Sequence, residues 1–158
     1  GQTVQVWADG RRRSDVTISG GGTASLGATY ARVVYGLGYT AEFLSAKLAY
    51  AAKLGTAVGQ TKIVRGAGLI LANSCLDGIR VGKDATYTDP MPDFVDGAER
   101  TENQFFEEYD HDIFPIQSDW DTDARIYISA DSSEGPVTVQ AVILDIETRE
   151  GLPHQAGD

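Results

Sequence analysis

The sequence has 158 residues, 42% of them hydrophobic and 23% charged, which is enough for one domain with a buried core and ordinary for a folded chain. No apolar stretch approaches the roughly 20 residues of a membrane-spanning helix, and no signal-peptide pattern opens the chain. The net charge of −10 argues against a simple nucleic-acid binder, because such proteins present a basic face to phosphates.

The charges are unevenly divided along the chain. Residues 1–75 hold eight Lys and Arg against three acidic residues, whereas residues 76–158 hold five against twenty. This division is typical of subunits that pack side by side with unlike charges facing, or of a solvated acidic insertion. The sequence opens at Gly1 without a Met, and we expect it to be a fragment of a longer protein.

Cys75 is the only cysteine, so the chain cannot form an internal disulfide, which is compatible with assembly in a reducing cytoplasm. The residues from Leu69 to Leu76 are mostly apolar. We therefore expect Cys75 to be a buried, unreactive thiol and not a nucleophile.

The chain begins with a predicted strand, Thr3–Ala8, in which valines recur at the two-residue period of a half-buried strand. Asp9 and Gly10 form a strong turn signal, and Asp15–Ser19 is predicted as the returning strand. Three glycines follow, and Thr23–Leu26 is predicted as a short third strand. Together these segments indicate a hairpin or meander.

The middle of the chain gives one conflicting signal. Tyr30–Tyr35 is predicted as a strand. In Tyr39–Tyr50 the apolar residues fall at helical spacing and Ala is frequent, so propensity alone predicts a helix. After a loop at Gly55–Gly59, Thr61–Cys75 is predicted as one long strand or two short ones, and Ile79–Val81 as the next.

Residues 83–111 differ in character, with many acidic residues and several turn signals. We expect a long acidic loop or arm here, with a short helix over Glu99–Tyr109. Phe105 and Phe106 are expected to anchor this segment to a core or to a neighbouring molecule.

Strand patterns return after the acidic segment. Asp112–Ile116, Arg125–Ser129 and Val137–Ile146 are predicted strands, and a polar tail occupies about residues 148–158. Many short strands joined by turns predict a single, mainly β domain, built as an antiparallel β-sandwich or a barrel-like fold.

Three alternating acidic residues, Asp119, Asp121 and Asp123, resemble the opening of an EF-hand calcium loop. That loop needs Gly at its sixth position and Glu at its twelfth, where this chain has Ala124 and Ala130. A polar turn before the next strand explains the same residues, and we favour it over calcium binding.

No catalytic, cofactor-binding or metal site is predicted, and the chain is not expected to be an enzyme. His111 lies between Asp110 and Asp112, but adjacent residues on a strand point to opposite faces, and His154 is the only other histidine. The Gly-x-Gly pairs lie outside any βαβ pattern, and no Gly-x-Ser-x-Gly elbow occurs. The aromatic residues leave a sugar-binding face open as an alternative to core and interface positions.

Three stretches of the sequence resemble the C-terminal region of tail nozzle proteins of short-tailed phages, also called tail tubular protein B-like or tail stabilisation proteins. The first is similar to the family's opening hairpin and its Gly-Leu-Pro-Tyr-Thr-Ser stretch. The second is similar to a Gln-Gly-(Arg/Lys)-x-Lys-Arg segment, and the third to a closing Trp-Asp turn, a Pro-Leu-Thr-Val-type turn and a last strand. In this sequence they are Val4–Gly10 with Val33–Ala41, Gly55–Ile63, and Trp120–Ile128 with Pro136–Leu144.

The sequence departs from the family pattern at two of these stretches. Gly38 stands where the family has Pro, and the segment around Lys62 is less basic than usual. The resemblance also predicts that Tyr39–Tyr50 is a strand, against its helical propensity, because tertiary pairing can override propensity.

The resemblance implies a structural virion domain in the phage tail, assembled in the bacterial cytoplasm, with no reaction, cofactor or membrane partner. It implies a ring of six subunits that extends the portal and adaptor channel, through which DNA passes without specific binding. An acidic channel wall would repel phosphates, and residues 83–111 are the candidate for it. The alternative hypothesis is a carbohydrate- or receptor-binding β module of a phage tail.

Overall fold

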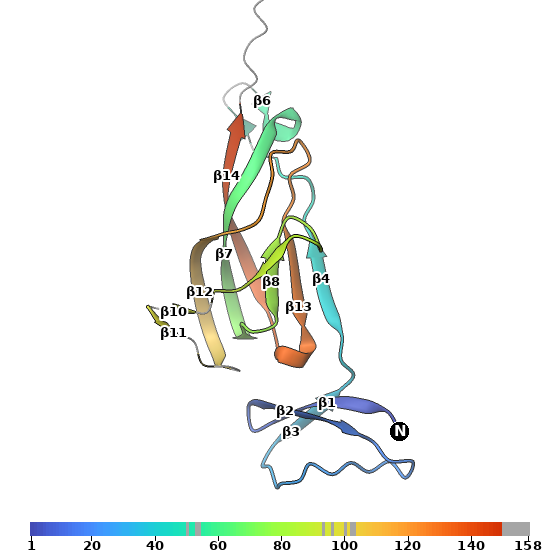
Figure 1. The fold of residues 1–158 in the computed structure, drawn as a ribbon. Helices are drawn as coiled ribbons and strands as arrows, with labels where there is room; N and C mark the ends of the chain where they lie inside the picture. Colours follow the sequence, from blue (N-terminus) through green and yellow to red (C-terminus); the bar gives the residue numbers. More distant parts are fainter. Residues whose placement is uncertain are drawn as a thin grey trace, which may run out of the picture.

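A computed structural model describes residues 1–49, 51–52, 55–92, 94–95, 97–99, 101 and 104–149. The protein is mainly β, and its strands pair antiparallel, as the sequence predicts. It has two parts, a small N-terminal sheet and a larger pair of packed sheets (Figure 1). Within the described residues, no helix is long and apolar enough to cross a membrane.

The N-terminal sheet contains β1 (Thr3–Ala8), β2 (Arg11–Thr17) and β3 (Val33–Gly36), in the order β2-β1-β3. The predicted turn after β1 is present, and Asp9 and Gly10 both have positive φ. The predicted third strand at Thr23–Leu26 is wrong. Those residues belong to no strand, and the second edge of β1 pairs with β3 instead.

The first sheet of the larger part has the order β12-β7-β14. Its central strand β7 (Thr61–Cys75) is one long strand, paired on one side with β12 (Phe105–Pro115) and on the other with β14 (Val139–Arg149). Most residues of β7 are buried because it has neighbours on both edges and the second sheet against one face. Gly68 permits this pairing, since a Cβ there would lie 2.9 Å from the His111 carbonyl oxygen on β12.

The second sheet has the order β4-β13-β8-β9. Its strands are β4 (Thr40–Leu44), β13 (Tyr127–Asp131), β8 (Ile79–Gly82) and β9 (Thr88–Pro90). The remaining elements are two short strand pairs and two short 3-10 turns: β5 (Ala51–Ala52) with β6 (Gly55–Thr56), β10 (Phe94–Val95) with β11 (Ala98–Glu99), η1 (Ala57–Gly59) and η2 (Ser132–Glu134).

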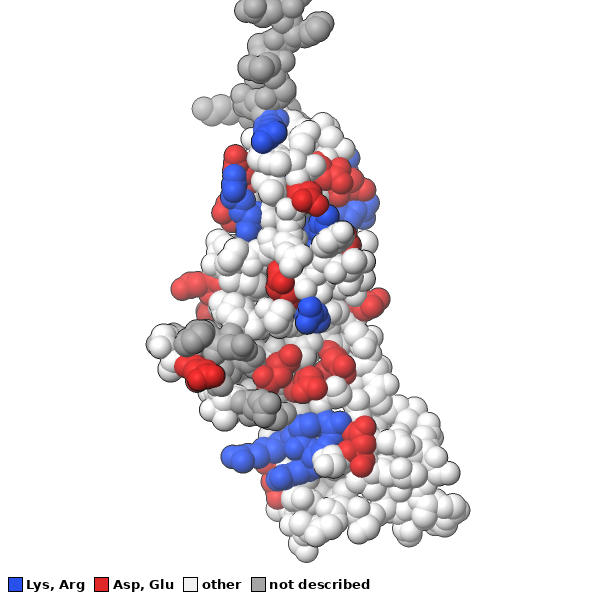
Figure 2. Space-filling view, viewed as in Figure 1, with Lys and Arg blue, Asp and Glu red and all other residues white. Residues whose placement is uncertain are grey.

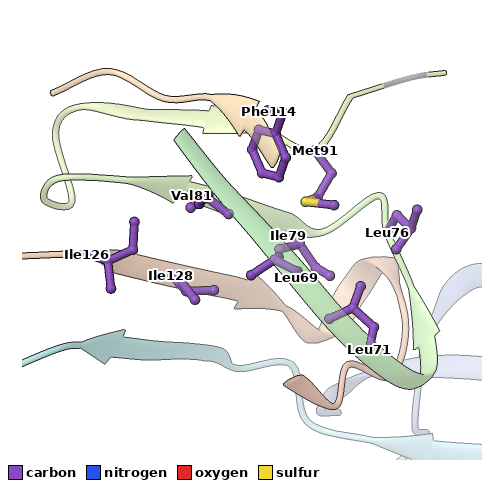
Figure 3. Close-up of a cluster of buried hydrophobic side chains, with 10 residues drawn as sticks. Leu69, Leu71, Leu76, Ile79, Val81, Met91, Phe114, Ile126 and Ile128 are labelled. Atoms are coloured by element: carbon purple, nitrogen blue, oxygen red, sulfur yellow. The ribbon is translucent and has the colours of Figure 1, made fainter. Parts of the chain in front are cut away.

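The hydrophobic core lies between these two sheets (Figure 3). Leu69 and Leu71 of β7 meet Ile79 and Val81 of β8, and all four are at most 1% exposed. Phe114 of β12 and Ile128 of β13 also belong to the core. The segments between strands add Leu76, Met91 and Ile126. The sheets keep separate strand orders with open edges, so the arrangement is a sandwich and not a closed barrel.

The two predictions of helix are wrong where the structure describes the chain. Within Tyr39–Tyr50, Thr40–Leu44 is the strand β4, so the strand that the phage resemblance predicts is present over those residues only, and residues 45–49 belong to no strand. Within Glu99–Tyr109, the residues from Phe105 onward belong to β12. Each segment pairs with a strand distant in sequence, and this pairing overrides local propensity. The tail predicted at about residues 148–158 begins too early, because β14 extends to Arg149, and the rest of that range lies outside the described residues.

Candidate functional site

The three alternating aspartates are engaged within the chain. Asp119 forms an ion pair with Lys83, and Asp123 with Arg125. Asp121 Oδ1 accepts a hydrogen bond from the backbone N–H of Asp123 at 2.9 Å, and this backbone hydrogen bond is the main cause that lowers the pKa of Asp121. In the part of the chain that the structure describes, no group of three His, Cys, Asp or Glu residues is arranged to hold a metal ion.

His111, for which the sequence predicts no metal-binding or catalytic role, packs among aromatic side chains. Its ring lies in a row of aromatic side chains on β12, 5.7 Å from the Tyr109 ring and 5.0 Å from the Phe114 ring, centroid to centroid. Asp110 and Asp112 are exposed. Cys75 is fully buried, which confirms the prediction of an inaccessible thiol.

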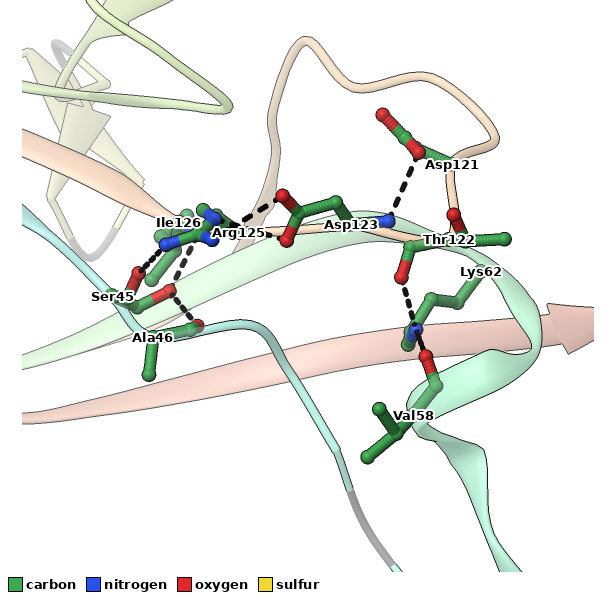
Figure 4. Close-up of polar contacts among 9 residues, drawn as sticks. All are labelled: Ser45, Ala46, Val58, Lys62, Asp121, Thr122, Asp123, Arg125 and Ile126. Atoms are coloured by element: carbon green, nitrogen blue, oxygen red, sulfur yellow. Dashed lines mark hydrogen bonds and ion pairs between the residues drawn. The ribbon is translucent and has the colours of Figure 1, made fainter.

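Lys62 is a fully buried charged residue at one end of the sandwich (Figure 4). Its Nζ donates hydrogen bonds to the carbonyl oxygens of Gln60 at 3.0 Å and Thr122 at 2.9 Å. The backbones of Lys62 and Asp121 also form two hydrogen bonds of 2.9 Å. Burial is the main cause that lowers the pKa of Lys62. These contacts join the turn before β7 to the turn before β13.

A polar junction connects the N-terminal sheet to the sandwich at Ser132. The Ser132 hydroxyl donates to Gln5 Oε1 at 3.0 Å and accepts from the backbone N–H of Tyr39 at 2.7 Å. The Ser132 N–H donates to the Tyr39 carbonyl at 3.0 Å. Arg12 adds a hydrogen bond from its Nε to the Ser133 carbonyl. The junction therefore holds β1, β2 and the start of β4 against η2.

A glycine sets how closely the two parts approach. Gly135 has φ of 126°, in the region that favours glycine. A Cβ at this position would lie 2.8 Å from Cys75 Sγ and 2.8 Å from the indole of Trp7. Trp7 belongs to the N-terminal sheet and Cys75 to the sandwich, so the contact needs the absence of a side chain.

An apolar groove of about 540 Å³ runs beside this junction. Trp7 and Val34 line it from the N-terminal sheet, and Tyr39, Phe105 and Pro136 line it from the sandwich. Tyr39 is 68% exposed and Phe105 45% exposed. Aromatic rings at the solvent boundary suit contact with another molecule, because the rings bury a large area when covered.

The most exposed apolar segment of the described chain is residues 33–44, which we call the apolar edge. It comprises β3, the connection through Leu37 and Tyr39, and β4. Among the residues that the structure describes, thirteen large hydrophobic residues are exposed, and seven of them lie in this segment: Val33, Val34, Tyr35, Leu37, Tyr39, Phe43 and Leu44. Both β3 and β4 are outermost strands of their sheets, so the segment offers backbone groups as well as apolar side chains.

Charged side chains are unevenly distributed: arginines cluster on β2, whereas the sandwich carries both basic and acidic side chains. On the face shown in Figure 2, Lys and Arg side chains gather on the N-terminal sheet, and acidic side chains lie above them on the sandwich. Arg11, Arg12 and Arg13 are consecutive on β2. Exposed Glu107, Glu108, Asp110 and Asp112 are on β12. The apolar edge between residues 33 and 44 carries only one charged residue, Glu42.

Sequence reasoning did not identify the apolar edge as a surface. The signal was present in the first part of the segment, where Val33, Val34, Tyr35 and Leu37 place apolar groups on both faces of a strand. A strand with one solvated face alternates instead. Lys62 lies in one of the stretches that resemble the phage family, but no pattern in the surrounding sequence indicates that its amine is buried.

Comparisons with known proteins give no relative for this chain. No protein-family model matches the sequence, and no curated protein matches it.

Proposed function

We propose that this chain is a structural domain of a tailed-phage virion, part of a tail nozzle that extends the portal channel for DNA passage. Its partners are further copies of itself in a six-membered ring, together with portal, adaptor or other tail proteins. DNA passes through the ring without specific binding, and the domain performs no reaction.

The observation that carries the proposal is a set of hydrogen bonds made by the three stretches that resemble tail nozzle proteins. Lys62, in the second stretch, donates to the carbonyl of Thr122, in the third. Gln5 and Tyr39, both in the first, bind the same serine, Ser132. The residues that carry the resemblance thus hold backbone segments together at the two ends of the sandwich. Contacts of this kind fix the positions of backbone segments, which supports a structural role for these residues.

The charge distribution supports the same proposal. The exposed carboxylates of β12 repel phosphates, which favours passage of DNA over adhesion. The apolar edge supplies what a scaffold needs for contact with other subunits, since large exposed apolar patches mark interaction sites. Segment 83–111 remains the proposed channel wall, and β12 contributes its last residues.

The test is localisation of the domain in purified virions. Antibodies raised against the 158-residue chain are expected to label particles at the tail, and mass photometry of the longer protein is expected to give a ring mass near six subunits. Particles that contain no such polypeptide by mass spectrometry would refute the virion role. A ring mass that corresponds to a different number of subunits would change only the proposed stoichiometry.

A second candidate, a carbohydrate- or receptor-binding module, is favoured by the aromatic groove at Trp7, Tyr39 and Phe105. A glycan array is its direct test. Binding that is lost in Phe105→Ala and retained in Tyr87→Ala, a similarly exposed aromatic outside the groove, would establish this function. No glycan signal above that of an unrelated protein would exclude the glycan form of this candidate.

A further inference from the structure

We propose that the apolar edge binds a second copy of this chain, whose strand β14 supplies the facing backbone over Val139–Leu144. The inference rests on the proposed function, because it assumes that the domain assembles with itself, and it names the surface and the strand that the partner offers. Its basis is the distribution of charge among the outermost strands.

Three of the six outermost strands in the three larger described sheets carry features that oppose pairing with another chain. β2 contains three consecutive arginines, and β12 contains four acidic residues. β9 has only three residues and ends with Pro90, which has no N–H to donate. Charged side chains, proline and short length are the features by which proteins protect strand edges.

Two outermost strands besides β14 lack this protection. β3 has no charged residue, and β4 has Glu42 alone. Their apolar side chains are exposed as well, with Tyr35 at 68% and Phe43 at 53%. An exposed, uncharged strand edge with apolar side chains is a template for another strand.

Within a second copy, β14 offers the matching edge. Its first six residues, Val139–Leu144, carry no charge, whereas Asp145, Glu147 and Arg149 follow in its second half. Val139 and Ile143 are 36% and 49% exposed. This uncharged run has about the length of β4, so a five-residue strand can pair along it before the charges begin.

Charge also disfavours the symmetric alternative, in which β4 pairs with β4 of the second copy. Glu42 is the central residue of β4, so a two-fold pairing centred on the strand places two carboxylates opposite each other, and like charges directly opposite are destabilising. Facing Val139–Leu144 instead, Glu42 meets no acidic residue. A contact between unlike surfaces also suits a ring, because it propagates from one subunit to the next.

Sedimentation velocity on the 158-residue chain over a range of concentrations tests the surface. We expect self-association, weakened about tenfold or more by Phe43→Lys and by Ile143→Lys, since each buries a charge at the contact. Ile113→Lys is the matched control, because Ile113 is 52% exposed and lies on the acidic strand β12. Circular dichroism of each variant verifies folding. Equal effects of all three substitutions would overturn the assignment.

Chemical cross-linking tests which strands meet, and it works for weak association. Cys75 is fully buried, so an introduced cysteine is the accessible thiol. A short bis-maleimide added to a mixture of Phe43→Cys and Ile143→Cys chains is expected to give a mixed dimer. Dimer from Phe43→Cys alone would show pairing of β4 with itself. That result, or no more mixed product than with Ile113→Cys, would overturn the proposal.

These outcomes separate the inference from the proposed function. If virions contain the domain and the longer protein forms a ring that Phe43→Lys leaves intact, the function stands and the docking edge is refuted. If virions lack the domain but Phe43 and Ile143 still cross-link, the edge stands and the virion role is refuted.

Discussion

The sandwich and the N-terminal sheet are stabilised in different ways. The sandwich buries one continuous cluster drawn from strands β7, β8, β12 and β13. The buried apolar side chains of the N-terminal sheet are Val4, Val6 and Ala8, all on β1, and one face of that sheet is hollowed by about 240 Å³. Small sheets of this kind are marginal without packing against another element. The sandwich is therefore expected to fold on its own core, and the N-terminal sheet to depend on the junction.

The largest expected effect comes from the sandwich core. Leu69→Ala should lower the free energy of unfolding by about 2–5 kcal/mol, because it leaves a cavity beside fully buried neighbours. Urea unfolding followed by circular dichroism measures the change. Leu37→Ala, at a side chain that is 59% exposed, is the control and should change stability by less than about 0.5 kcal/mol. Similar losses in both variants would mean that the sandwich core is not the main source of stability.

Lys62 gives the next largest expected effect. Lys62→Met removes the buried amine that donates to the carbonyls of Gln60 and Thr122, which should cost about 1–3 kcal/mol, because hydrogen bonds from a charged donor are lost. Arg65→Met is a suitable comparison, because Arg65 is exposed and its ion pair with Glu147 is worth at most about 1 kcal/mol. Equilibrium unfolding measures both. A Lys62→Met protein as stable as the parent would show that the amine is dispensable.

Ser132→Ala tests the dependence of the N-terminal sheet on the junction. The substitution removes the side-chain hydrogen bonds to Gln5 and Tyr39. Each lost hydrogen bond should lower stability by about 0.5–1.5 kcal/mol. Hydrogen exchange should accelerate at the amides of β1 and β3 while those of β7 stay protected. Uniform acceleration in β1 and β7 would mean that the two parts unfold as one unit.

The smallest expected effect is a change in alkaline stability at Tyr127. Burial first, and then a hydrogen bond with Glu42, raises the pKa of Tyr127 above its ordinary value of 10.0. The unfolded chain therefore ionises at lower pH than the folded one, and stability should fall as pH rises past about 10. Tyr127→Phe should remove this part of the fall, measured as thermal midpoints from pH 8 to 11. Parallel curves for parent and variant would contradict the assignment.

Lys62 acts in the opposite direction over the same range. Its pKa is lowered in the folded chain from 10.5, so the folded chain releases the proton first, and stability gains as pH rises toward that value. Comparison of Tyr127→Phe with the parent cancels this gain, since both retain Lys62.

The sequence predicts the fold best where the pattern of apolar residues within one segment is enough to identify a strand. Thr3–Ala8 and Thr61–Cys75 are strands as predicted, because alternation or a continuous apolar run marks them locally. Propensity alone predicts a helix over Tyr39–Tyr50, and only the phage resemblance predicts a strand there. Thr40–Leu44 is a strand because it pairs with Tyr127–Asp131, more than eighty residues away. The second half of the apolar edge could not be predicted, since the exposure of Tyr39 or Phe43 depends on which strands flank them, and that order is not encoded locally.

Gly135 has a consequence for how this architecture can change over time. Because the Trp7 indole and the Cys75 thiol occupy the space that a side chain would need, an alanine there would force Trp7, Cys75 or the turn itself to shift. One nucleotide change, from a glycine to an alanine codon, is enough to introduce it. Related chains could thus differ in how Trp7 packs against the sandwich through substitution at this one position.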